Sequence, residues 1–402
     1  MLKVSKISFG VVGLWLCMTH GVLAQNTYSP YSVLGIGELQ GMDLVHNMAM
    51  GGVGISTPNP FHLNNKNPAL LPRNRVVVFE TAVSAEQKRL STTDLEQDNF
   101  TGGLGYLVFG FPVIRDTWTI SAGLMPYSIV NYKSTDVGFV TGTATELNTT
   151  FEGGGGISQA YFASGLKLFK GISVGFRASY LFGSIRQETV FDVAGTNYLT
   201  ADVERNSFSD VTFGLGAAYT LEIRENLSYM NFGITYEFGG EQGVTRLQRL
   251  ERRGFSNDPI SPVDEPPYLV LDDIDGNVKF PATLGLGISY EKSLRWTIGA
   301  DLIMGQWSNY LNFEDEPEGL NDRTEFAIGG SYIPDAFSVN NYLKRVTYMM
   351  GLNYQTTPYL VDGEEIQDFG INFGVTFPLR NLSRLSLAFK VGQRGTTDND
   401  LI

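Results

Sequence analysis

The feature that most constrains this chain is a series of short segments in which apolar residues alternate with small or polar ones. In Phe213–Tyr219, Leu284–Tyr290 and Phe369–Phe377, every second residue is apolar, and those between are Gly, Ala, Ser, Thr or Asn. This period of two is typical of β-strands, because successive side chains point to opposite faces. A soluble β-sandwich would normally carry Lys and Glu on its polar face, so these uncharged faces favour a transmembrane barrel.

Thirteen segments of this kind predict strands. They lie near residues 75–90, 102–112, 117–133, 157–169, 172–188, 207–222, 227–239, 280–291, 294–307, 324–333, 344–357, 366–378 and 382–395. Bacterial single-chain barrels generally have an even number of antiparallel strands, and the final residues 396–402 form a polar run without a closing strand. We therefore expect an all-β, transmembrane antiparallel β-barrel of about fourteen strands, whose last strand is missing or whose closure is unusual.

The connections predict the orientation of the barrel. Short turns near 114–116, 169–171, 224–226, 291–293 and 379–381 should be periplasmic, and longer stretches near 134–156, 189–206, 240–279 and 308–323 should face the exterior. In the longest stretch, Val244, Leu247 and Leu250 recur every three residues. This spacing predicts a short helix over 244–253, which could contact lipopolysaccharide phosphates, cap the mouth of the barrel or pack on neighbouring loops.

The N-terminal residues predict that the protein is exported from the cytoplasm. Lys3 and Lys6 precede an apolar stretch from Phe9 to Leu23, with small residues before Gln25, so residues 1–24 are predicted to be a secretory signal peptide. Together with a barrel, this predicts a multi-pass protein of the bacterial outer membrane, in contact with its lipid. The formal charge of −13 makes nucleic acid an unsuitable partner.

The residue types argue against catalysis. The single cysteine lies in the predicted leader, so the mature chain has no thiolate nucleophile or metal ligand. Its two histidines, His46 and His62, lie outside the predicted strands, whereas enzymatic barrels need a catalytic residue at a strand end. We therefore expect no enzyme activity, no cofactor and no metal, with both histidines hydrogen-bonded in their segment.

Residues 25–74 break the alternation. Gly and Pro turns and a short helix around 42–50 are too irregular for lipid contact, so this segment should lie in the lumen or the periplasm. Its residues Met50–Ile55, followed by Asn65–Leu71, resemble the N-terminal hatch of the FadL-type (FadL/TodX-like) outer-membrane transport proteins. The opening Ser29–Gly37 also looks like family members from the Bacteroidota.

The resemblance implies a domain order and a function. Residues 25–74 would be a hatch inside a barrel of residues 75–402, and fourteen strands are the family's number. The residues expected to shape the hatch are Gly51, Gly52, Gly54, Asn67, Pro68 and Ala69. FadL-type proteins carry hydrophobic molecules, such as long-chain fatty acids or hydrocarbons, across the outer membrane, and hatch movement would gate such uptake here.

Two sets of polar residues are further candidates. Five charged residues fall on the inner face of the alternation: Lys167, Arg177, Glu237, Asp301 and Lys390. Facing lipid would cost a base ~2–4 kcal/mol at the midplane, so they should point inward, pinning the hatch or, less favoured, lining a polar route. Asp273, Asp275 and Asn277 are a weak calcium-loop candidate, but the bidentate Glu is missing and a solvated acidic turn is the favoured interpretation.

Aromatic residues near the predicted strand ends suggest interfacial girdles. The set comprises Trp118, Tyr127, Tyr132, Trp296, Trp307, Tyr310, Tyr332, Tyr348 and Tyr359.

The favoured function is therefore gated uptake of a hydrophobic small molecule. The alternative is a non-catalytic scaffold or shuttle subunit, with outer-membrane protein partners, in a secretion machine of type IX kind or an assembly machine. The lumen separates the two, because an enclosed apolar cavity supports uptake, whereas a lumen filled by the hatch and by ion pairs supports a scaffold.

Overall fold

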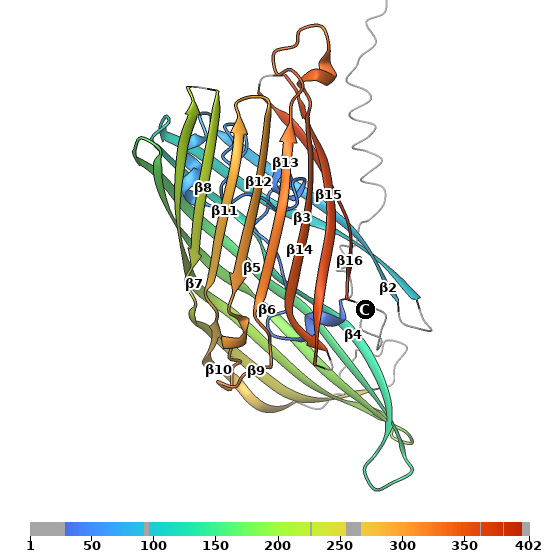
Figure 1. Ribbon diagram of the computed structural model, residues 1–402. Helices are drawn as coiled ribbons and strands as arrows, with labels where there is room; N and C mark the ends of the chain where they lie inside the picture. The colour runs from blue at the N-terminus through green and yellow to red at the C-terminus, as the bar shows by residue number, and fades with distance from the viewer. Residues whose placement is uncertain are drawn as a thin grey trace, which may run out of the picture.

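A computed structural model describes residues 29–91, 96–225, 227–254, 267–361, 363–380 and 382–395. The predicted signal peptide, residues 1–24, and the polar run 396–402 lie outside the described residues. One antiparallel sheet rolls into a barrel shape and carries almost all of the described secondary structure (Figure 1). The all-β, antiparallel prediction is confirmed.

Thirteen strands form the continuous path of the sheet. In chain order they are β2 (Val78–Ser91), β3 (Glu96–Ile114), β4 (Trp118–Phe139), β5 (Glu146–Phe169), β6 (Ile172–Val193), β7 (Tyr198–Arg224), β8 (Ser228–Glu237), β11 (Thr283–Lys292), β12 (Trp296–Gly305), β13 (Arg323–Tyr332), β14 (Thr347–Val361), β15 (Glu364–Pro378) and β16 (Arg384–Arg394). Each overlaps one of the thirteen predicted strands, and the short turns between them fall where the sequence predicted them.

Three further strands join this path from the side. The two-residue β1 (Glu38–Leu39) pairs with β4, while β9 (Gly240–Gly254) pairs with both β7 and β10 (Tyr268–Phe280). The helix predicted over 244–253 is therefore wrong. Gln242, Val244 and Arg246 are buried in alternation, and strands on both sides satisfy the backbone of β9.

The connections predicted to be long on the exterior side are mostly strand. β4 continues to Phe139 and β5 begins at Glu146, while β6 continues to Val193 and β7 begins at Tyr198. The residues in these stretches pair in continuous ladders with the neighbouring strands, so the hairpins extend past the apolar zone. As a result β4 to β7 have 22, 24, 22 and 27 residues, whereas β8, β11, β12 and β13 have 10 each.

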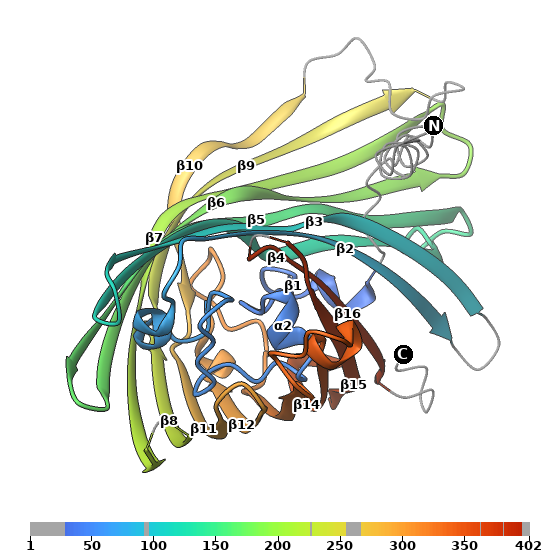
Figure 2. The same cartoon turned by 90° about the horizontal axis from the view of Figure 1, so that it is seen from above.

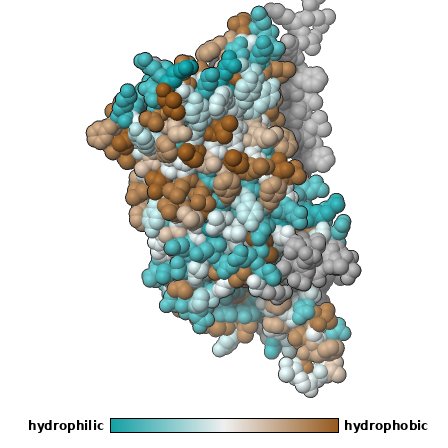
Figure 3. Space-filling model, in the orientation of Figure 1, coloured by the Kyte–Doolittle hydropathy of each residue, from teal (hydrophilic) through white to brown (hydrophobic). Residues whose placement is uncertain are grey.

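The outer face of the sheet is apolar around its middle. Large hydrophobic side chains such as Phe109, Phe176, Ile234 and Leu352 are exposed there, and brown residues gather in a zone across the molecule in Figure 3. Such a continuous apolar surface is expected of a protein that meets lipid. Among the described residues, no helix has the length and hydropathy to span a bilayer.

The predicted aromatic girdle is correct only in part. Trp118, Tyr332 and Tyr348 are exposed, but Tyr132, Trp307, Tyr310 and Tyr359 are buried. The buried rings belong to an apolar cluster inside the barrel, because strand-end position alone does not tell an inward side chain from an outward one.

The N-terminal segment, residues 29–74, lies inside the ring of strands (Figure 2). Its short helices are η1 (Pro30–Val33), α2 (Val45–Met48) and η2 (Pro68–Arg73), and α2 falls within the helix predicted around 42–50. Two apolar clusters join the segment to the sheet, one around Ile36 and Tyr310 and one around Leu44 and Leu63.

The wall of strands is incomplete at two places among the described residues. β2 and β16 end the path and do not pair with each other; we call this gap the seam. β3 pairs with β4 only over Leu107–Ile114, and beyond Leu124 the edge of β4 bonds instead to β1 and to residues 29–40. The fourteenth strand stays a prediction.

Candidate functional site: the filled lumen

Inward-facing glycines let the N-terminal segment approach the strands at backbone distance. A Cβ on Gly165 or Gly175 would overlap backbone atoms of Pro68, and one on Gly233 would overlap the carbonyl oxygen of Ile55. Only glycine fits at such contacts. The small residues of the alternation thus provide room for the segment on the inner face.

The predicted hatch glycines lie in a tight turn against β12 and β14. Gly51 and Gly52 have φ of +74° and +91°, in the region that favours glycine, and a Cβ on Gly51 would lie 2.8 Å from the Leu352 nitrogen. The Gly54 amide donates a 2.6 Å hydrogen bond to Oδ2 of Asp301 on β12.

The Asn67–Pro68–Ala69 tripeptide begins η2 and bonds in three directions. Oδ1 of Asn67 accepts from the Ala69 amide at 3.0 Å, which caps η2. Its Nδ2 donates to the carbonyls of Ile55 at 2.8 Å and of Ala217 on β7 at 3.2 Å. One buried side chain therefore joins the turn, the helix start and the wall.

Three of the five predicted lumen charges engage the segment or support a residue that does. Asp301 is buried and also accepts from the Ile55 amide at 2.8 Å. Arg177 on β6 is buried, donates to the Asn65 carbonyl at 2.6 Å and forms an ion pair with Glu237 on β8.

The other two predicted charges do not contact the segment through any described polar bond. Lys390 on β16 pairs with Asp368 on β15 at 2.9 Å, and Lys167 is exposed close to the β5–β6 turn. The alternation of side chains along each strand places both residues on the inner side. Alternation does not show, however, how close the N-terminal segment comes to a given position along the strand.

A buried ion cluster that the sequence did not indicate lies at the centre of the segment. Lys66 Nζ is 3.1 Å from Oδ1 of Asp43 and 3.6 Å from Oε1 of Glu325 on β13, and it donates to the Gly52 carbonyl at 2.5 Å. Burial alone would lower the pKa of Lys66, but the carboxylates of Asp43 and Glu325 raise it above the ordinary value. Lys66 therefore stays charged and fixes the glycine turn.

Glu38 on β1 bridges the seam from inside. Its carboxylate is 3.1 Å from Nζ of Lys88 on β2 and 2.5 Å from Nη1 of Arg394 on β16. Burial alone would raise the pKa of Glu38, but the two cations lower it to about 2. The two unpaired edge strands are thus connected through a residue of the N-terminal segment, which the sequence could not show because the partners are far apart along the chain.

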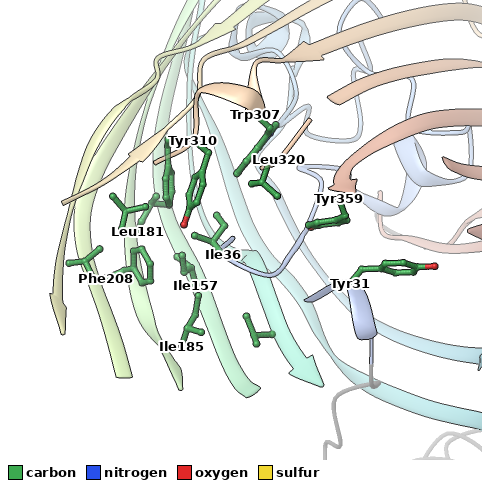
Figure 4. Close-up of a cluster of buried hydrophobic side chains, with 14 of the residues drawn as sticks. Tyr31, Ile36, Ile157, Leu181, Ile185, Phe208, Trp307, Tyr310, Leu320 and Tyr359 are labelled. Atoms are coloured by element: carbon green, nitrogen blue, oxygen red, sulfur yellow. The ribbon is translucent and has the colours of Figure 1, made fainter. Parts of the chain in front are cut away.

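An apolar cluster lies around the part of the lumen that faces the long hairpins (Figure 4). The side chains of Ile36, Leu181, Phe208 and Tyr310 belong to it. Beside it lies a cavity of about 220 Å³ whose lining also includes the charged Glu204, Arg246, Glu314 and Glu318. This volume is below the ~300–1,000 Å³ of usual ligand pockets.

The weak calcium candidate is not a turn. Asp273, Asp275 and Asn277 lie on strand β10, where Asp275 accepts from the Thr245 hydroxyl at 2.7 Å and Asn277 donates to Glu241 at 3.3 Å. Asp275 and Asn277 lie in the regular part of the β9–β10 ladder and make cross-strand contacts there, whereas Asp273 lies at a register shift, 3.9 Å from Arg205 of β7.

The BamG family model matches residues 2–402. The chain belongs to the BamG family. A sequence comparison with curated proteins gives no significant match to this BamG-family chain.

Solved structures with the same fold as the BamG-family chain include hydrocarbon channels. They include a "CymD monoaromatic hydrocarbon channel" (14% identity, TM-score 0.51, 87% of this chain and 92% of that one). A Pseudomonas aeruginosa FadL homologue has 11% identity and a TM-score of 0.53, and the match covers 89% of this chain and 91% of that one. The "TodX monoaromatic hydrocarbon channel deltaS2 mutant" has 17% identity and a TM-score of 0.52, and the match covers 90% of this chain and 93% of that one. At these identities the likeness shows a FadL-like fold and no more; the Bacteroidota likeness stays a prediction.

Proposed function

We propose that this BamG-family protein is a non-catalytic scaffold subunit of the outer membrane, with residues 25–74 acting as a fixed plug. The observation that carries this proposal is the filled lumen. Backbone contacts at Gly165, Gly175 and Gly233 occupy the inner face, and buried charges of the wall bond to the segment. Removing one member of a buried ion pair typically costs about 3–5 kcal/mol, so such a plug would not leave readily.

The incomplete wall also supports a scaffold. In a bilayer, lipid cannot satisfy the unpaired N–H and C=O groups of an edge strand. The seam between β2 and β16 is such a site in the described chain, and an added strand there would pair both edges. A barrel protein that binds partners in the membrane could bind them by strand pairing at an edge of this kind.

Gated uptake of a hydrophobic small molecule is the second candidate. The neighbours with this fold include hydrocarbon channels, and one feature favours uptake: residues 29–40 cover the edge of β4 where β3 leaves it. Movement of that part of the segment would open a lateral route from the apolar cluster at Ile36 to the bilayer.

Native mass spectrometry separates the two candidates. The full-length protein would carry a small affinity tag and be extracted from its own outer membrane in mild detergent. The scaffold predicts a stoichiometric protein companion and an empty barrel. A bound fatty acid or hydrocarbon without a protein companion would contradict the scaffold and support uptake.

A Gly52→Pro variant tests gating directly. Proline requires φ near −65°, whereas Gly52 has +91°, so the turn that holds Lys66 would be distorted. Uptake of a labelled fatty acid by cells should stop if the segment is a gate, and Gly142→Pro, at a positive-φ glycine with open space around it, is the control. Equal uptake by both variants would remove the gating role.

A further inference from the structure

Two histidines and a glutamate meet where the N-terminal segment contacts β2. His46 on α2, His62 on the following loop and Glu80 on β2 each offer one ligand atom, and these atoms lie within 4.8 Å of one another. The two imidazole rings stack, with centroids 4.8 Å apart and planes inclined by 30°. In the described parts of the chain, this is the one group of three or more His, Cys, Asp or Glu with such spacing.

His46 has no partner that explains its position. It is 3% exposed, and neither ring nitrogen has a hydrogen-bond partner among the described residues. Both histidines were predicted from the sequence to be hydrogen-bonded, and this holds only for His62, whose Nδ1 is 3.3 Å from Oε1 of Glu80. Buried polar atoms are nearly always satisfied, so two unpaired nitrogens on one ring indicate a ligand.

Apolar side chains surround the His46 imidazole. Leu44, Leu63 and Val108 of the same apolar cluster are fully buried. An imidazole binds a metal through the lone pair of one ring nitrogen, and a dry pocket of this kind keeps water from competing for the ion.

We propose that His46, His62 and Glu80 bind one divalent first-row transition-metal ion, with zinc the best match. Two imidazoles and one carboxylate suit zinc, whereas calcium and magnesium prefer oxygen ligands alone. Ligand atoms around tetrahedral zinc are roughly 3.4 Å apart, from bond lengths near 2.05 Å, so small side-chain rotations would bring this group together.

The ion would act as a cross-link between the plug and one edge of the seam. His46 is part of α2, which also lies against β15 and β16, and the neighbouring Ala49 packs against Gly374 of β15. Glu80 belongs to β2, the opposite edge strand. A bound ion would therefore hold α2 to β2 and so connect both edges from inside, independently of which proposed function is correct.

The test uses the full-length protein in detergent with an affinity tag that contains no histidine. After chelator treatment and exchange, the protein is titrated with Zn²⁺ alone and its metal content is measured by elemental mass spectrometry. One equivalent per chain is expected for the native sequence, with a loss of at least tenfold in affinity in His46→Gln and Glu80→Gln. Glu86→Gln is the matched control, because Glu86 lies on the same strand with an exposed side chain.

A second measurement keeps the proposal falsifiable if a variant fails to fold. Co²⁺ replaces zinc in sites of this kind, and its visible spectrum reports nitrogen and oxygen ligands in the native sequence without any mutation. A stoichiometric Co²⁺ spectrum displaced by Zn²⁺ is expected. Absence of stoichiometric metal in the native protein, or equal binding by folded Glu80→Gln and Glu86→Gln, would overturn the site.

Discussion

The N-terminal segment meets the barrel in two different ways. Along β5 and β6, where every strand is paired on both sides, the segment contacts the wall through glycines and backbone atoms. At the seam, where β2 and β16 lack a mutual pairing, it contacts the edges through the charged Glu38. Close backbone packing is therefore the main contact along β5 and β6. Buried charges such as Glu325 also bond to the segment on the paired wall, whereas at the seam ion pairs connect edges that no backbone pairing joins.

The largest expected effect is at the seam. In Glu38→Gln, the cations of Lys88 and Arg394 lose a buried carboxylate, which should lower the free energy of unfolding by about 3 kcal/mol. Urea unfolding in detergent, followed by tryptophan fluorescence, measures the change. Glu86→Gln removes an exposed partner of the same Lys88 and should cost below ~1 kcal/mol; equal costs would contradict the closing role of Glu38.

The wall should be the next most sensitive region. In Gly175→Ala the new methyl group would overlap the Pro68 backbone, so the segment must shift at a cost of about 2 kcal/mol. Gly154→Ala on β5 is the control, because no atom lies within 4 Å of its Cβ position. The same urea assay should separate the variants, and limited proteolysis of the segment should accelerate only in Gly175→Ala. Similar behaviour of both would mean that the segment does not press on the wall.

Acid should weaken the seam before the wall. The pKa of Glu38 is lowered in the folded protein to about 2 from 4.5, so its contribution is complete above pH 4.5 and is lost as pH falls towards 2. Between pH 7 and pH 3 the difference in unfolding free energy between the native protein and Glu38→Gln should shrink by roughly 2 kcal/mol. A constant difference would show that Glu38 is not ionised at the seam, while the Gly175→Ala difference should stay constant.

The smallest effect concerns the cap of η2. Asn67→Ala removes the bond to the Ala69 amide and leaves the Ile55 and Ala217 carbonyls without this donor, at about 1 kcal/mol. Asn341 makes the same cap on the exposed η4 (Tyr342–Arg345), so Asn341→Ala isolates the capping share. If Asn67→Ala lowers the free energy of unfolding by no more than Asn341→Ala does, then Asn67 acts only as a helix cap and its bonds to the Ile55 and Ala217 carbonyls contribute nothing.

The sequence was sufficient for the strands and insufficient for the lumen. Alternation identified all thirteen strands of the sheet path, since a period of two needs only local residues. It could not show that β9 continues the sheet, because the three-residue spacing of Val244, Leu247 and Leu250 mimics a helix turn.

The candidate site was predicted unevenly for the same reason. Asp301 and Arg177 were found because a charge in an apolar strand is conspicuous. Lys66 and Glu38 were missed because they lie in an irregular segment whose partners, Glu325 and Arg394, are about 260 and 356 residues away along the chain. The three-dimensional arrangement of the strands around the segment, not a local pattern, brings these residues together.

The unequal strands give the molecule a high side and a low side. About 9–11 residues suffice for a strand to cross a bilayer, so a crossing would take up all 10 residues of β8, β11, β12 and β13. The 27 residues of β7 would leave about 16 beyond the lipid, which can extend roughly 40 Å or more when tilt is allowed for. A partner binding on that side would therefore have long strands beside it on one flank and short strands on the other, so its direction of approach would be restricted.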